Sequence, residues 1–434
     1  MLQLLWTLFF IVLFCWIVNR HPFFYHRRVH PLMFQFAFLL KIFAGIILTW
    51  IYVHFYTDRK TADIFKYFDD SKIMYDALST APHDFVRMFF GIHADDADLF
   101  HYYNKMVAWD DSDMAYNDNR IMIRFNCMMR FISFGNFYIH IISMCFITFY
   151  GLTCIFRLFA SEVKGKYFGI FCAVFFMPSV VFWGSGVLKD GVILFATGLF
   201  LYNFNRLLNN SAHLKNKIFF ALGLLLMMFV KVYVLAIMIP GLVMLLIVKR
   251  RPQWNLNKLR YWTIVYLLYG LSVYCLQFIS GINVVELISL KQHQFMSLAT
   301  AVGSGSLVSM PELSDTQSIV AGIPHALYNM FFQPFFWNKS LVIFIAGLEN
   351  IFILVVSVIC ISKINRQNFY STPWFFFSLF FLFILYCLIG LIVPVAGALV
   401  RYKTIALPFL AIMLVILIDK NKSDKLLSKL NLKF

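Results

Sequence analysis

Apolar runs about 20 residues long recur from one end of the chain to the other, and they constrain its fold more than any other feature. A helix needs about 20 apolar residues to cross a hydrocarbon core roughly 30 Å thick. Of the 434 residues, 61% are hydrophobic and 13% are charged, which is too little charge to cover a soluble protein of this length. The sequence therefore predicts an all-α, polytopic integral membrane bundle with a single transmembrane domain, residues 1–434.

We expect about eleven helical segments. The run Ile218–Val248 has about 31 residues and is bracketed by Lys217 and Lys249, so that both ends should face the cytoplasm. It is either a pair of short helices turning near Lys231 or one long tilted helix. The other expected spans are Leu2–Val18, Met33–Tyr56, Phe134–Phe156, Tyr167–Trp183, Val187–Tyr202, Tyr261–Ser280, Leu341–Ile361, Trp374–Ala398 and Ile405–Ile418.

The charges are distributed as in a membrane protein with an acidic external loop. Thirteen of the 21 acidic residues lie between Asp58 and Asp118, whereas Lys and Arg form short clusters between apolar runs. By the positive-inside rule the N-terminus faces out and the C-terminus is cytoplasmic. Residues 57–125 then form a first external (periplasmic) loop and residues 281–339 a second. The net charge of +16 therefore points to a membrane surface and not to nucleic acid.

Ionisable residues within or beside apolar runs are the candidates for chemistry. A charge in hydrocarbon costs about 2.5–3.5 kcal/mol and is tolerated where it meets a cavity or a partner. The stretch FWGSGVLKDG places Lys189 and Asp190 between two apolar helices, where glycines allow close approach. Each cation could also be a side chain that reaches the interface, and Asp190 could cap a helix. The candidate phosphate-binding cations are Lys189, Lys231, Arg401, Lys403, Arg124 and Arg130.

Carboxylates supply the candidates for a base and for a structural partner. Glu349 lies about nine residues into an apolar span, where we expect it to be a structural or gating partner of a cation, as is Asp190. Residues 61–78 form an amphipathic helix that offers Asp63, Asp69 and Asp70 near the membrane surface. Such a carboxylate could deprotonate a hydroxyl, hold a divalent cation such as Mg²⁺ or Mn²⁺, or merely face solvent.

Three stretches resemble a known group of proteins. FMPSVVFWGSGVLKDG, PHALYNMFFQPFFWN followed by LEN, and LVRYKTIALPFL are similar to segments of bacterial inner-membrane proteins from surface-polysaccharide gene clusters. These are described as O-antigen repeat-unit polymerase-like or GT-C-like membrane glycosyltransferases. The likeness covers roughly residues 120–415. It departs from the GT-C pattern in having no adjacent Asp-Glu pair in the loop, which also follows the second span and not the first.

The resemblance implies transfer of a sugar, or polymerisation of repeat units, from a polyprenyl phosphate or diphosphate at the external membrane face. It implies that Lys189, Arg401 and Lys403 hold the carrier phosphate and that Asp63 is the base, with Asp69 or Asp70 as substitutes. The partners would be membrane lipid, the polyprenyl-linked sugar donor and a glycan acceptor. Two alternatives remain open: a transporter or flippase of lipid-linked glycans, and a non-catalytic scaffold for polysaccharide assembly.

Overall fold

A computed structural model describes the chain except for residues 56–58, 110–117, 210–212, 282, 302–305, 336–340, 363–369, 371 and 419–434. The regular structure of the described residues is helical. They contain two isolated β-bridges and no extended β-strand. Eight helices are long and apolar enough to cross a membrane, and a bent pair, 396–405 with Leu407–Leu417, makes up to nine. The expectation of an all-α multi-pass membrane protein is confirmed in this coarse form. The basic tail after residue 418 lies outside the described residues.

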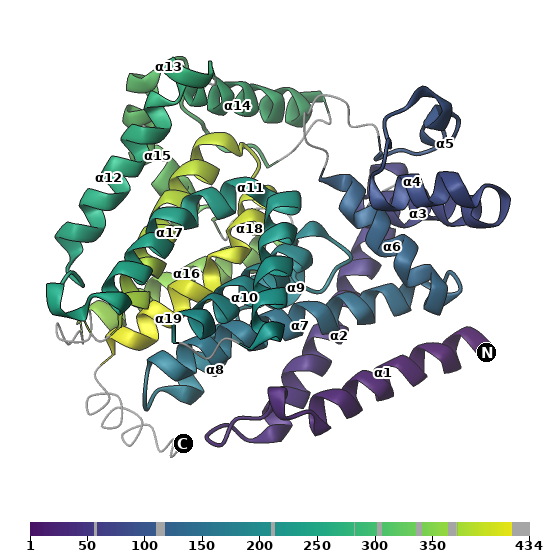
Figure 1. Cartoon of the computed structure of the whole chain (residues 1–434), viewed down its shortest axis with the longest axis horizontal. Coiled ribbons are helices and arrows are strands. Elements are labelled where there is room, and N and C mark those ends of the chain that lie inside the picture. Colours follow the sequence, from purple (N-terminus) through teal and green to yellow (C-terminus); the bar gives the residue numbers. More distant parts are fainter. Residues whose placement is uncertain are drawn as a thin grey trace. The chain divides into compact units, whose positions relative to one another are not determined.

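The chain divides into two compact units. Unit 1 comprises residues 1–155, 181–207 and 212–232, and unit 2 comprises residues 156–180, 208–211 and 233–434. The helices of unit 1 are coloured purple to teal in Figure 1, and most of those of unit 2 are green to yellow.

Unit 1 combines membrane helices with a polar helical subdomain. Its long apolar helices are α1 (Leu2–Arg20), α2 (Pro31–Phe55), α7 (Phe137–Glu162) up to Ile155, and α10 (Lys189–Leu208) up to Leu207. The polar helices are α3 (Asp63–Thr80), α4 (Pro82–Phe90), α5 (Phe100–Tyr103) and α6 (Asn119–Ser133), of which α3, α4 and α6 pack on one another (Figure 1). They occupy the predicted first external loop, so its amphipathic helix is present.

Helices α7 and α10 approach each other at backbone distance. A Cβ atom placed on Gly198 would lie 2.0 Å from the carbonyl oxygen of Gly151. One on Gly151 would lie 2.3 Å from the Cα of Phe195. Membrane helices often associate through small residues that allow such close approach. In lipid there is no hydrophobic driving force between helices, so van der Waals packing drives their association.

Unit 2 is a bundle around α17 (Pro373–Ile392). It contains only the start of α9 (Pro178–Trp183), up to Val180. Helices α15 and α17 lie side by side (Figure 1), and a Cβ on Gly390 would meet the Ala326 carbonyl oxygen at 2.3 Å. The remaining helices are α8 (Tyr167–Phe175), α12 (Leu259–Cys275), α13 (Gln277–Ser280), α14 (Val284–Ala301), α15 (Thr316–Phe332), α16 (Leu341–Ser362), α18 (Ala396–Tyr402) and α19 (Leu407–Leu417).

Two expected spans are interrupted, and prolines mark both breaks. The run Tyr167–Trp183 forms α8 and α9, with α9 beginning at Pro178, which has no N–H to continue the preceding helix. The run Trp374–Ala398 ends as helix at Ile392, before Pro394, and resumes as α18. Each of these runs therefore contains two helices, and the expected count of about eleven helical segments is not confirmed.

The long run around Lys231 has a break where a turn was expected. Helix α11 (Leu214–Arg250) carries one residue with non-helical angles, Lys231, at φ −150° and ψ 78°. The residues up to Val232 belong to unit 1 and those from Tyr233 to unit 2. The hairpin itself stays a prediction.

Candidate functional site

The most informative polar site in unit 1 surrounds the turn between α9 and α10, residues 184–191, which we call the 184–191 turn. Glycines let neighbouring helices close around it. A Cβ on Gly186 would lie 3.0 Å from Leu48 of α2, and one on Gly191 would lie 2.9 Å from Met144 of α7. The Thr148 hydroxyl also donates to the Gly191 carbonyl at 3.2 Å. The glycines expected to allow close approach therefore do so on two sides.

Three lysines from distant parts of the sequence reach this turn. Lys41, in the middle of α2, is 1% exposed and donates to the Gly184 carbonyl at 2.9 Å. Lys231 forms a buried ion pair with Asp190, Nζ to Oδ1 at 3.1 Å. Lys189, the first residue of α10, pairs with Asp118 at 2.5 Å. The lysines belong to α2, α11 and α10. Lys41 and Lys231 contact residues of the turn, whereas Lys189 lies within the turn and pairs with a carboxylate outside it.

The two carboxylates partly balance the three ammonium groups. Asp190 is buried beside Lys231, whereas Asp118 keeps 29% of its side chain exposed and Lys189 keeps 15%. The Lys189 ammonium also lies 5.8 Å from the centroid of the Tyr67 ring. Lys189, which is more exposed than Lys231, is thus paired with an aspartate whose side chain is itself partly exposed to solvent.

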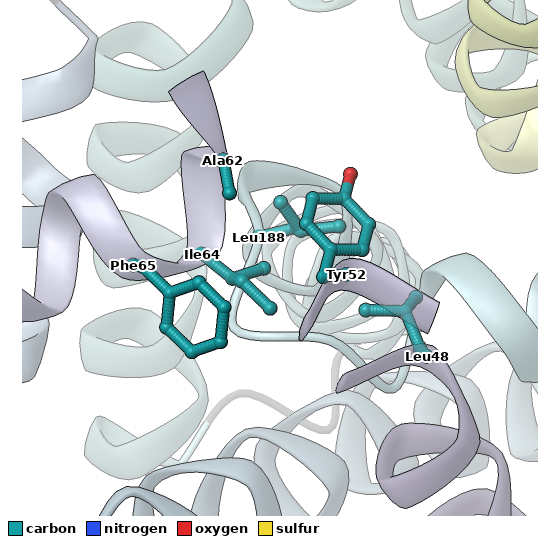
Figure 2. Close-up of a cluster of buried hydrophobic side chains, with 6 residues drawn as sticks. All are labelled: Leu48, Tyr52, Ala62, Ile64, Phe65 and Leu188. Carbon is teal, nitrogen blue, oxygen red and sulfur yellow. The ribbon is translucent and has the colours of Figure 1, made fainter. Parts of the chain in front are cut away.

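The start of α3 packs directly on the turn. Ile64 and Phe65 share a buried apolar cluster with Leu188, the residue before Lys189, and with Leu48 of α2 (Figure 2). Asp63 immediately precedes this pair of apolar residues and is half-buried. The structure therefore brings the predicted base and the predicted phosphate-binding lysine onto neighbouring segments of the same unit.

The other two candidate bases have structural partners. Asp70 is 1% exposed and accepts hydrogen bonds from the backbone N–H groups of Val107 at 2.9 Å and Ala108 at 2.7 Å. Burial raises the pKa of Asp70 above its ordinary value, although both N–H groups act to lower it. Asp69 is exposed and forms a bidentate pair with Arg59, at 2.7 and 2.9 Å. Asp70 ties the loop 107–108 to α3, which leaves it poorly placed to meet a substrate.

The arginines of α6 also hold the subdomain together. Arg130 is buried, donates to the Ser71 hydroxyl at 2.8 Å and to the Phe68 carbonyl at 2.5 Å, and lies over the Phe68 ring. Arg124 donates to the Met88 carbonyl at 3.1 Å. Burial lowers the pKa of both guanidinium groups. These contacts give both arginines a role in helix packing, and their expected binding of phosphate stays a prediction.

The remaining candidates belong to unit 2 and form a network around Glu349. Glu349 accepts from the backbone N–H of Ser179 at 2.9 Å and from its hydroxyl. The neighbouring Asn350 donates to the Gln333 carbonyl at 2.7 Å and accepts from the ammonium of Lys403. We call these five residues the Glu349 network. They join FMPS, FFQP, LEN and RYK, pieces of the stretches that carry the resemblance.

Glu349 and Lys403 are 5% and 2% exposed, so the network is internal to unit 2. The hydrogen bonds of Glu349 come from Ser179, and its expected role as the structural or gating partner of a cation stays a prediction. Arg401 is half-buried at the end of α18. Arg401 and Lys403 belong to unit 2, and Lys189 and Lys231 belong to unit 1. Binding of one carrier phosphate by these four cations therefore stays a prediction.

Sequence reasoning missed Lys41 and Asp118. Lys41 stands alone in the apolar run LLKIFAGIIL, which is the same signal that singled out Lys231. Asp118 is one of thirteen acidic residues of the loop, and nothing in its local sequence distinguishes it from the others. No group of three or more His, Cys, Asp or Glu side chains placed to hold a metal ion occurs among the described residues.

Comparison of the chain with protein-family models, with curated proteins and with solved structures gave no match.

Proposed function

We propose that the chain is a multi-pass membrane glycosyltransferase or repeat-unit polymerase of the GT-C-like kind. It would use sugars linked to polyprenyl phosphate or diphosphate for surface-polysaccharide assembly. In this proposal it lies in a bacterial inner membrane, acts at the external face, and has its N-terminus outside and its C-terminus in the cytoplasm. The membrane-spanning helices and the ionised groups buried among them support a lipid-linked, anionic substrate.

The observation that carries the proposal is the packing of the α3 start against the 184–191 turn (Figure 2). It sets Asp63 and Lys189 on adjoining segments, one a carboxylate and the other an ammonium group that is 15% exposed. Transfer of a sugar from a lipid phosphate needs both a group that takes a proton and a group that neutralises the departing phosphate. The other candidate base on this helix, Asp70, is committed to backbone N–H groups.

The step follows from these two roles. Asp63 accepts the proton of the acceptor hydroxyl as its oxygen forms a bond to the anomeric carbon of the donor sugar. The bond between that carbon and the phosphate oxygen breaks, and the electron pair leaves with the polyprenyl phosphate or diphosphate. Lys189 stabilises the charge that develops there. Removal of one such electrostatic contact from an active site costs about 10²–10³ in kcat in comparable sites.

The Glu349 network is the second support. The resemblance rests on short stretches spread over residues 176–410, and four of their pieces meet through buried hydrogen bonds in unit 2. Such agreement is expected where the stretches belong to one functional unit. In this proposal Glu349 and Lys403 maintain the fold of unit 2, because both are buried in pairs with Ser179 and Asn350.

The test is turnover of a purified protein. Wild-type protein in liposomes is supplied with a polyprenyl-diphosphate-linked oligosaccharide, and glycan length is followed by gel and mass spectrometry. Asp63→Asn and Lys189→Met are compared with Asp76→Asn and Lys72→Met, which change the same residue types at an exposed pair on α3. We expect the first two to lose at least 100-fold in turnover and the controls to keep it.

Turnover that persists in Asp63→Asn and Lys189→Met would refute the assigned site. Movement of the glycan across the bilayer with no new glycosidic bond would instead establish a flippase, which is the competing function. An active Lys72→Met variant ensures that a loss in Lys189→Met is not a general effect of removing positive charge.

A further inference from the structure

The Lys189–Asp118 ion pair has features that its neighbour, the Lys231–Asp190 pair, lacks. Lys231 and Asp190 are 7% and 4% exposed, so that pair is closed to solvent. In the other pair, Asp118 is 29% exposed and Lys189 15%. The two pairs therefore differ in access, although Lys189 and Asp190 are consecutive in the sequence.

Among the described residues, the carboxylate of Asp118 accepts a hydrogen bond from the ammonium group of Lys189 and forms an ion pair with it. An ammonium group has three donors, and this contact uses one of them. On a second side the ammonium faces the Tyr67 ring, whose hydroxyl donates to Asn119, the residue after Asp118, at 3.0 Å. The tyrosine thus contacts both the segment of Asp118 and the ammonium group of Lys189.

We propose that Asp118 is an internal counter-ion that occupies the anion position of Lys189 until the phosphate of the lipid carrier displaces it. The inference rests on the proposed function and adds a regulatory residue to the same site. Without an anion, a largely buried ammonium group is costly, and Asp118 removes that cost. A phosphate brings up to two negative charges and three acceptor oxygens, so it competes well against one carboxylate.

The displaced carboxylate has a way to be solvated. Asp118 is already partly exposed, so leaving Lys189 costs it little, whereas Asp190 is 4% exposed and would lose its ammonium group in a buried position. Exchange is therefore expected at Asp118 and not at Asp190. The consequence is that Asp118 weakens phosphate binding, and its removal strengthens it.

The test measures binding of farnesyl diphosphate, a water-soluble prenyl diphosphate, to purified protein by calorimetry. We expect Asp118→Asn to bind about three- to tenfold more tightly than wild type, because it no longer competes for the ammonium. The double variant Asp118→Asn/Lys189→Met should bind no more tightly than Lys189→Met alone. The increase in affinity must therefore disappear when the lysine is absent.

The matched control is Asp95→Asn. Asp95 pairs with Arg120 at 2.7 Å in the same subdomain, and its replacement changes the net charge by the same amount. If Asp95→Asn and Asp118→Asn increased the affinity for farnesyl diphosphate equally, net charge would explain the increase, and the proposed exchange would be overturned. Unchanged or weaker binding in Asp118→Asn would overturn it as well. Asp118→Ser provides a second variant if the asparagine variant unfolds.

Failure of the proposed exchange at Lys189 can be distinguished from failure of the proposed function. If Asp118→Asn does not tighten binding but Lys189→Met abolishes turnover, Lys189 serves the reaction and the exchange is wrong. If Lys189→Met turns over the oligosaccharide normally, the proposed site itself is wrong, whatever Asp118 does.

Discussion

Separation of the buried pair Lys231–Asp190 should destabilise unit 1 strongly. Their side chains are 7% and 4% exposed and their charged atoms are 3.1 Å apart. Removing one partner of such a pair leaves a buried uncompensated charge, at a cost of about 3–5 kcal/mol. Unit 1 has roughly 200 residues, and for that size each kcal/mol lowers Tm by about 2–4 °C. We therefore expect Lys231→Met or Asp190→Asn to lower Tm by roughly 6–20 °C.

Thermal unfolding in detergent, followed by intrinsic fluorescence at one fixed scan rate, measures this difference. The double variant Lys231→Met/Asp190→Asn should recover most of the loss, since it leaves no unpaired charge. Lys72→Met, which breaks an exposed pair, should change stability by less than about 1 kcal/mol. If each single variant behaves like Lys72→Met, or if the double variant loses the sum of both, the pair does not compensate a buried charge.

Four further variants test other parts of the chain. Gly198→Ala places a methyl group 2.0 Å from the Gly151 carbonyl oxygen and should destabilise by several kcal/mol, whereas Gly270→Ala, with open space around it, should gain about 0.5–1 kcal/mol in the same unfolding assay. Lys403→Met removes the buried donor to the Asn350 side chain and should cost about 1–3 kcal/mol; equal Tm values would contradict its role in the Glu349 network. Because burial raises the pKa of Asp70, its contribution favours folding below about pH 4 and is lost as pH rises through the raised value. In the wild-type protein, Asp70 should make Tm fall as pH rises above about 4. Asp70→Asn should show a smaller fall over the same range, and an unchanged profile of Tm against pH would refute this.

The membrane helices could be predicted from the sequence because their signal is local. A run of apolar residues the length of α2 or α17 has few other folds open to it in a bilayer. The breaks at Pro178 and Pro394 were also readable, since proline cannot continue the hydrogen bonds of a preceding helix. Treating the two runs as continuous spans gave too much weight to hydropathy and too little to proline.

The partners of the charges could not be predicted, because they are set by tertiary packing. Lys189 and Asp118 are 71 positions apart, and Arg130 finds its acceptors 59 and 62 positions away. A sequence shows that a buried charge needs a partner but not which of many carboxylates or carbonyls supplies it. Asp70 illustrates this: its partners are two backbone N–H groups, which no side-chain pattern announces.

The central claim is that the chain makes glycosidic bonds from a lipid-linked donor. The most direct measurement is the mass of the lipid and glycan products after purified wild-type protein has been incubated with a polyprenyl-diphosphate-linked oligosaccharide. The proposal predicts free polyprenyl diphosphate together with a glycan extended by one or more units. Recovery of the donor intact, with the glycan at most moved to the other side of the bilayer, would contradict it.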